Sequence, residues 1–108
     1  MAGIVAARRE PLHDQVCFHC QQSAEKNLKA LLEKLGLAIP KTHDLEDLLD
    51  LLLPHHASLS RCRRGLRLLT GFAVDPRYPL WHATKRQAAS ALRWAGRVRD
   101  ACRTLLGL

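Results

Sequence analysis

Apolar residues recur along this chain at the spacing of helices. Between residues 14 and 35 they follow one another at steps of three and four, which predicts one helix with a single apolar stripe. Gly36 is suited to cap the end of that helix, and Pro40 prevents its continuation. Residues 2–9 have the pattern of the last turns of an earlier helix that ends near Pro11. The stripe consists of Cys17, Cys20, Ala24, Leu28, Leu31, Leu32 and Leu35.

Two shorter helical stretches follow. One begins after a cap at Thr42 or Asp44 and stops at Pro54, and the next opens at Ser58 or Ser60. Their predicted inward positions are Leu45, Leu48, Leu49, Leu52, Cys62, Leu66 and Leu69. The other positions of the second stretch are dominated by Arg61, Arg63, Arg64 and Arg67.

A loop over residues 71–79 and a long helix over residues 83–105 complete the pattern. The inward stripe of this helix is predicted to be Ala88, Ala91, Leu92, Ala95, Val98, Cys102 and Leu105, and its outer face carries Arg86, Arg93 and Arg97. No segment has the alternation of a β-strand. The sequence therefore predicts an all-α fold, an antiparallel up-and-down bundle of four to five helices, as one domain over residues 1–108.

The distribution of charge adds a functional indication. The net charge is +7, but residues 1–57 carry six basic and eight acidic side chains, whereas residues 58–108 carry eleven basic and only two acidic ones. A basic half of this size attracts polyanions such as nucleic acid. The alternative interpretation is a solvated helical face.

Membrane and metal chemistry receive little support from the sequence. The longest apolar stretch is short and contains Asp50, and an apolar start followed by Arg8 and Arg9 is the reverse of a secretory signal, so we expect a cytoplasmic protein. Cys17 and Cys20 form a CxxC pair without a second pair, inside a helical pattern. We interpret them as core residues rather than zinc or redox ligands, and we expect no metal and no cofactor.

Three segments resemble one known family. Residues 14–32 (DQVCFHCQQSAEKNLKALL), 41–45 (KTHDL) and 73–79 (AVDPRYP) are similar to the signature segments of HEPN domains (higher eukaryotes and prokaryotes nucleotide-binding), and they occur in the same order. The first helix is shorter here than in most members. The resemblance implies a helical bundle that forms a homodimer, often encoded beside a small nucleotidyltransferase as a toxin–antitoxin pair.

The resemblance also implies a catalytic pair. Active members are metal-independent ribonucleases that use an Arg-x4–6-His motif, and Arg77 and His82 fit it as the catalytic residues. Arg8 and His13 have the same spacing, but only the later pair precedes the last helix, where the motif belongs; the earlier pair is expected to straddle a turn. In members paired with a nucleotidyltransferase a Tyr often stands two residues after the His, and here that residue is Thr84. In relatives that lack the His, the Arg is structural.

The predicted nucleic-acid or nucleotide contacts are Arg61, Arg64, Arg86, Arg93, Arg97 and His43. For His19 and His43 the competing interpretation is a partly buried, hydrogen-bonded side chain that fixes helix contacts. Trp81 and Trp94 are candidates for stacking on bases, although packing in the bundle or at a dimer interface is the alternative for Trp94. Three functions remain open: a dimeric endoribonuclease, a non-catalytic nucleotide- or RNA-binding module that serves a nucleotidyltransferase, and a structural docking domain.

Overall fold

The chain folds into a bundle built on two long helices. A computed structural model describes the backbone of residues 2–72 and 83–108, and the side chains of the same ranges from residue 12 onward. In chain order the elements are α1 (Ala2–Lys34), α2 (Leu45–Leu52), the 3-10 helix η1 (Ala57–Cys62), α3 (Arg63–Thr70) and α4 (Lys85–Leu106). The described ranges contain no strand, which confirms the predicted all-helical bundle.

Helix α1 is continuous where the sequence predicts a break. It runs from Ala2 to Lys34 through Pro11, so the predicted helix end near Pro11 is wrong. A proline removes one backbone donor and strains the preceding turn, but the alanines and arginines before it favour helix strongly enough for the helix to continue. Arg8 and His13 consequently lie within α1 and not across a turn. The predicted end of α1 is confirmed, because Gly36 adopts a left-handed φ of 73°.

The core lies where the predicted stripes meet. Leu28, Leu31 and Leu32 of α1 and all four leucines of the stripe on α2 are fully buried, as are Leu66 and Leu69 of α3. Ala88, Ala91, Val98 and Cys102 line the inner side of α4. Leu92 was predicted to face inward, but it is 57% exposed. Ala91 and Leu92 are about 100° apart around the helix, and α4 turns the alanine side to its neighbours.

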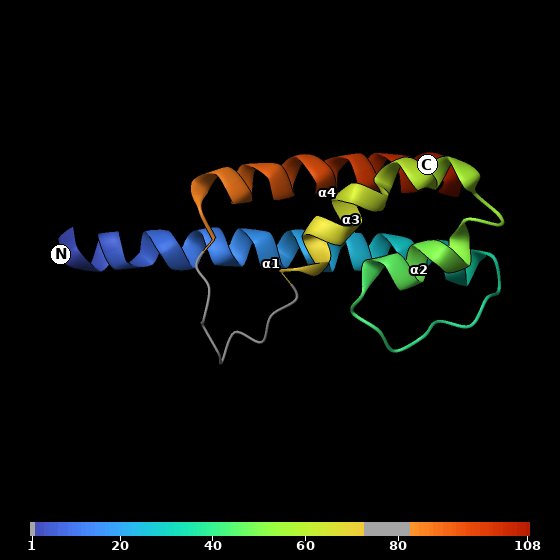
Figure 1. Cartoon of the computed structure of the whole chain (residues 1–108), viewed down its shortest axis with the longest axis horizontal. Coiled ribbons are helices and arrows are strands. Elements are labelled where there is room, and N and C mark those ends of the chain that lie inside the picture. Colours follow the sequence, from blue (N-terminus) through green and yellow to red (C-terminus); the bar gives the residue numbers. More distant parts are fainter. Residues whose placement is uncertain (1, 73–82) are drawn as a thin grey trace.

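The two long helices run side by side in the same direction (Figure 1). Near one end of the pair, the backbone N–H of Ala83 donates to the Asp14 carboxylate, and near the other the Lys34 ammonium donates to the carbonyl of Leu106 at 3.0 Å. Helix α3 runs antiparallel to α2, so that the N–H of Leu45, where α2 begins, donates to the hydroxyl of Thr70, where α3 ends. The segment of residues 35–44 returns the chain between α1 and α2. The helical bundle is as predicted, but its order is not the predicted antiparallel up-and-down one, because this return allows α1 and α4 to be parallel.

A side-chain cap fixes the start of α2. Asp44, one of the two predicted caps, accepts from the N–H of Glu46 at α2. Neither predicted serine caps the third stretch, which begins as η1 after His56 and has no side-chain cap.

Within the described residues, no helix has the length and apolar character needed to cross a membrane.

Candidate nucleic-acid interface

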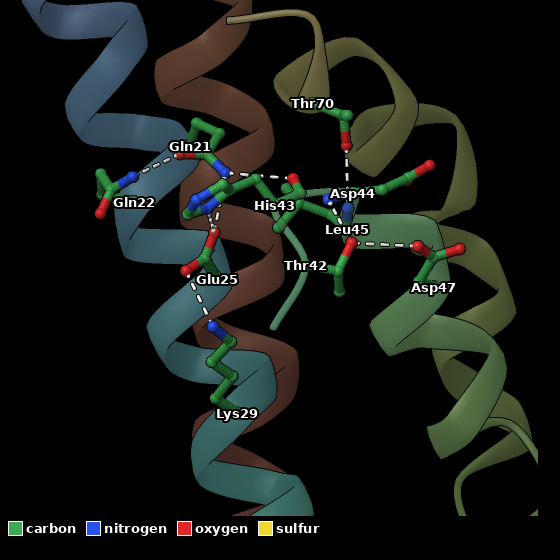
Figure 2. A network of polar contacts seen from close by, with 10 residues as sticks. All are labelled: Gln21, Gln22, Glu25, Lys29, Thr42, His43, Asp44, Leu45, Asp47 and Thr70. Atoms are coloured by element: carbon green, nitrogen blue, oxygen red, sulfur yellow. Dashed lines mark hydrogen bonds and ion pairs between the residues drawn. The ribbon is translucent and has the colours of Figure 1, made fainter. Parts of the chain in front are cut away.

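A polar network joins the α1 signature segment to the loop before α2 (Figure 2). Glu25, a residue only 8% exposed, accepts hydrogen bonds on one oxygen from the amide of Gln21 at 3.1 Å, and the same oxygen lies 3.0 Å from Nδ1 of His43. Its other oxygen pairs with the Lys29 ammonium at 3.0 Å. Gln21 is fully buried and also donates to the carbonyl of His43 at 3.4 Å. The network therefore holds the KTHDL segment against α1.

Opposing effects act on the carboxylate at the centre of this network. Burial alone would raise the pKa of Glu25, but the hydrogen bonds from His43, Lys29 and Gln21 outweigh it, and its pKa lies below the ordinary value. His43 is thus hydrogen-bonded as the structural interpretation expected. However, its side chain is 75% exposed rather than partly buried. His19 is also exposed, because it faces away from the side of α1 that carries Cys17 and Cys20.

The start of α4 is held firmly on α1. Ala83, which follows His82 in the sequence, donates its backbone N–H to Asp14, the first residue of the α1 signature segment. Thr84 then forms a capping box, in which its hydroxyl accepts from the N–H of Gln87 at 3.0 Å and its own N–H donates to the Gln87 side chain at 2.8 Å. Thr84 thus has a structural role as the helix cap. Arg77 and His82, the predicted catalytic pair, and Trp81 lie outside the described residues.

Two of the arginines on α3 are engaged by acidic residues of α2. Arg63 pairs with Glu46 at 3.2 Å and with Asp50 at 2.6 Å, and Arg67 contacts Glu46 at 3.0 Å. The hydrogen bond to Asp50 raises the pKa of Arg63, and that to Glu46 raises the pKa of Arg67. The same guanidinium groups hold the pKa of Glu46 below its ordinary value, with Arg67 making the larger contribution. These two arginines therefore stabilise the contact between α2 and α3.

The five arginines that were predicted to contact nucleic acid have no such partner among the described residues. Within the described part of the chain, no carboxylate pairs with Arg61, Arg64, Arg86, Arg93 or Arg97, and all five are exposed. Their contacts are weaker ones: Arg61 donates to the carbonyl of Ser58 at 3.3 Å, and Arg93 donates to the hydroxyl of Ser90 at 3.2 Å. The guanidinium of Arg97 lies over the ring of Trp94, 4.9 Å from its centroid. Their charges therefore remain available to an anion.

A groove between η1 and α4 brings two of these arginines together. It has a volume of about 280 Å³ and is lined by Ser58, Arg61, Cys62, Trp94, Arg97 and Ala101. His43 is bonded to α1 and is not one of the lining residues, and neither are Arg64, Arg86 and Arg93. The sequence did not predict the contributions of Ser58, Cys62 and Ala101. The contact between Trp94 and Arg97 was not predicted either, although their spacing of three residues on one helix is a signal that could have indicated it.

Trp94 is held in place by Gly65 of α3. A Cβ atom at Gly65 would lie 2.0 Å from Cε3 of the indole, so only glycine permits the ring to pack this closely. The side chain also packs against the hydrophobic core, as the packing interpretation expected, yet one part of it lines the groove. The indole that forms the aromatic wall of the groove is therefore packed directly against the backbone of α3.

The cysteines belong to the core. Cys17 and Cys20 are buried within α1, which confirms the packing interpretation of the CxxC pair. Burial, with a smaller contribution from Cys20, raises the pKa of Cys17 to about 11, so its thiol stays protonated near neutral pH and is a poor metal ligand. In the described ranges no three His, Cys, Asp or Glu side chains are grouped in a way that would hold a metal ion.

Comparison with known proteins gives one clear result. The family model described as HEPN domain matches residues 5–105, which is nearly the whole chain. Searches of curated proteins and of solved structures gave no match.

Proposed function

The chain belongs to the HEPN family, and from this premise we propose that it is a metal-independent endoribonuclease of the toxin–antitoxin type that acts as a homodimer. Family membership by itself supports a nucleotide-binding or ribonuclease-type module. The observation that carries the finer proposal is the position of the Arg77-x4-His82 motif. It ends immediately before Ala83, which Asp14 of the α1 signature segment holds on α1. The competing match of Arg8 and His13 falls inside α1.

The proposed chemistry needs only these two side-chain types. The 2′-OH of RNA attacks the adjacent phosphorus once a base removes its proton, and the bond to the 5′-oxygen breaks as an acid protonates that oxygen. Histidine suits both tasks near neutral pH, and a dimer supplies two copies of His82, one for each. Arg77 would bind the phosphate with its planar donors and stabilise the charge that develops in the transition state. The arginines without carboxylate partners in the described residues would attract RNA to the protein.

The test compares two histidines from motifs of equal spacing. His82→Ala should abolish cleavage of RNA in EDTA, because each proton-transfer role contributes about 10²–10⁴-fold. His13→Ala is the matched control and should leave the rate unchanged. Arg77→Lys should be strongly impaired, since a point charge does not reproduce the bidentate contact. Inert wild-type protein, a His82→Ala variant of full activity, or a monomer by light scattering at micromolar concentration would refute the proposal.

A second candidate is a non-catalytic nucleotide- or RNA-binding module that serves a small nucleotidyltransferase. The unpaired arginines favour it as much as the first, because binding a polyanion does not require His82. In partnered toxins the tyrosine often found two residues after the His is modified by the nucleotidyltransferase, whereas here the residue at this position is Thr84, which caps α4. Tight RNA binding without cleavage by the wild-type protein would select this second candidate.

A further inference from the structure

The groove between η1 and α4 combines the two properties of a nucleotide. Its walls include the indole of Trp94 and the small side chain of Ala101, and its charged groups are Arg61 and Arg97. Aromatic rings and guanidinium planes are the surfaces on which unpaired bases stack, and a guanidinium binds phosphate through two donors at once. Because no carboxylate in the described ranges pairs with either arginine, both are free to do so.

The size of the groove limits what it accommodates. Sites for small organic ligands in proteins measure roughly 300–1,000 Å³, and this one, at about 280 Å³, is at the lower limit. It therefore fits one base and not a stack of several. A base inside a duplex is paired and stacked on both sides, so only an unpaired one can enter. An acidic peptide could pair with the arginines, but it would supply no planar group to stack on the Arg97 guanidinium that lies over Trp94.

We propose that this groove binds a single unpaired nucleotide of RNA, with its base stacked on the Arg97 guanidinium that covers the ring of Trp94 and its phosphate on Arg61 and Arg97. The indole is already packed against Gly65 in the free protein, so binding loses little side-chain entropy at this residue. The proposal deepens the proposed function, since it rests on RNA being the ligand of the protein.

The groove lies far along α4 from the start of that helix. Thr84 caps the start of α4 and Arg97 lies thirteen residues further along it, which corresponds to about 20 Å of helix at 1.5 Å per residue. His82 stands two residues before Thr84 in the sequence. We infer that a nucleotide held in the groove fixes which phosphodiester of a strand reaches the proposed catalytic residues. The groove is then an exosite that determines the cleavage position.

The experiment measures binding of a single-stranded hexaribonucleotide whose 2′-hydroxyls are all methylated. Methylation removes the nucleophile, so cleavage does not interfere and the measurement is independent of His82. Arg61→Gln together with Arg97→Gln should reduce the slope of log affinity against log salt by about 0.7, the value for one phosphate contact on a single strand, and each single substitution should reduce it by a part of that amount. Arg103→Gln, an exposed arginine of α4 outside the groove, is the matched control and should leave the slope unchanged.

The base contact is tested from the ligand side, so that no variant has to fold. Replacing one residue of the hexamer by an abasic site should weaken binding roughly 5- to 100-fold, as expected for one stacked base, without changing the salt slope. A 4-thiouridine at the same position should cross-link to the groove, mapped by mass spectrometry. Equal binding of intact and abasic RNA, equal effects of Arg97→Gln and Arg103→Gln, or cross-links only outside the groove would overturn the proposal. Should the groove bind as described while wild-type protein leaves unmodified RNA uncut, only the nuclease proposal fails.

Discussion

Arg63 and Arg64 are neighbours in the sequence and have opposite surroundings in the structure. Arg63, together with Arg67, is engaged by the carboxylates of α2, whereas Arg64 and the four arginines of η1 and α4 have no carboxylate partner in the described residues. Successive side chains of a helix point about 100° apart. Arg63 can therefore bind α2 while Arg64 faces solvent. The difference teaches that a basic half is not uniformly a binding surface, because part of its charge is neutralised within the fold.

The largest expected effect concerns salt. If the five unpaired arginines each contact a phosphate, the affinity for single-stranded RNA should fall about 100-fold between 50 and 200 mM salt, because each contact releases counterions. Removing the two paired arginines together, as Arg63→Gln with Arg67→Gln, should leave that dependence unchanged, since their charge is already used by Glu46 and Asp50. Fluorescence anisotropy across a salt series measures both. An affinity that does not vary with salt would remove the distinction between the two sets.

A second prediction concerns the wall of the groove. Gly65→Ala should destabilise the fold by about 1–3 kcal/mol, the usual cost of forcing extra volume into a packed site, because the new methyl group would overlap Trp94. Gly96→Ala in α4 is the matched control: its nearest neighbour would be the Arg99 guanidinium at 3.9 Å. That change should stabilise the helix by roughly 0.5–1 kcal/mol. Urea unfolding measures both, and equal effects of the two substitutions would contradict the close packing of Trp94.

The smallest effect is expected from lowering the pH, which changes the stability of the fold through a buried carboxylate. Because the folded pKa of Glu25 lies below its ordinary value, its ionised form is favoured by folding. That stabilisation is complete above about pH 4.3, the ordinary value for glutamate, and is lost as the pH falls through the lowered folded pKa. Glu25→Gln should flatten the dependence of unfolding free energy on pH in this range. Glu33→Gln, an exposed carboxylate of the same helix, should leave it intact, and identical profiles for the two variants would refute the role of Glu25.

Much of the fold follows from the sequence alone. Apolar residues at steps of three and four define the buried side of each helix whatever its partner is, so the leucines of α1, α2 and α3 were predicted correctly. Gly36 and Asp44 mark helix ends through local backbone and side-chain chemistry. The membership of the HEPN family was likewise predicted from short segments. The pair of Arg77 and His82 stays a prediction, because it lies outside the described residues.

The remaining features depend on which elements become neighbours, and local chemistry does not encode that. The stripe on α4 did not specify whether Ala91 or Leu92 faces α1, because both fit a helical period. Pro11 marks a helix end by its own chemistry, yet α1 continues through it. The parallel course of α1 and α4 depends on where residues 35–44 return the chain. Sequence alone determined which residues are basic. The packing of α3 on α2 decided which arginines are neutralised, and the packing of η1 on α4 decided which arginines line a groove, since both require atoms from separate helices within a few ångströms.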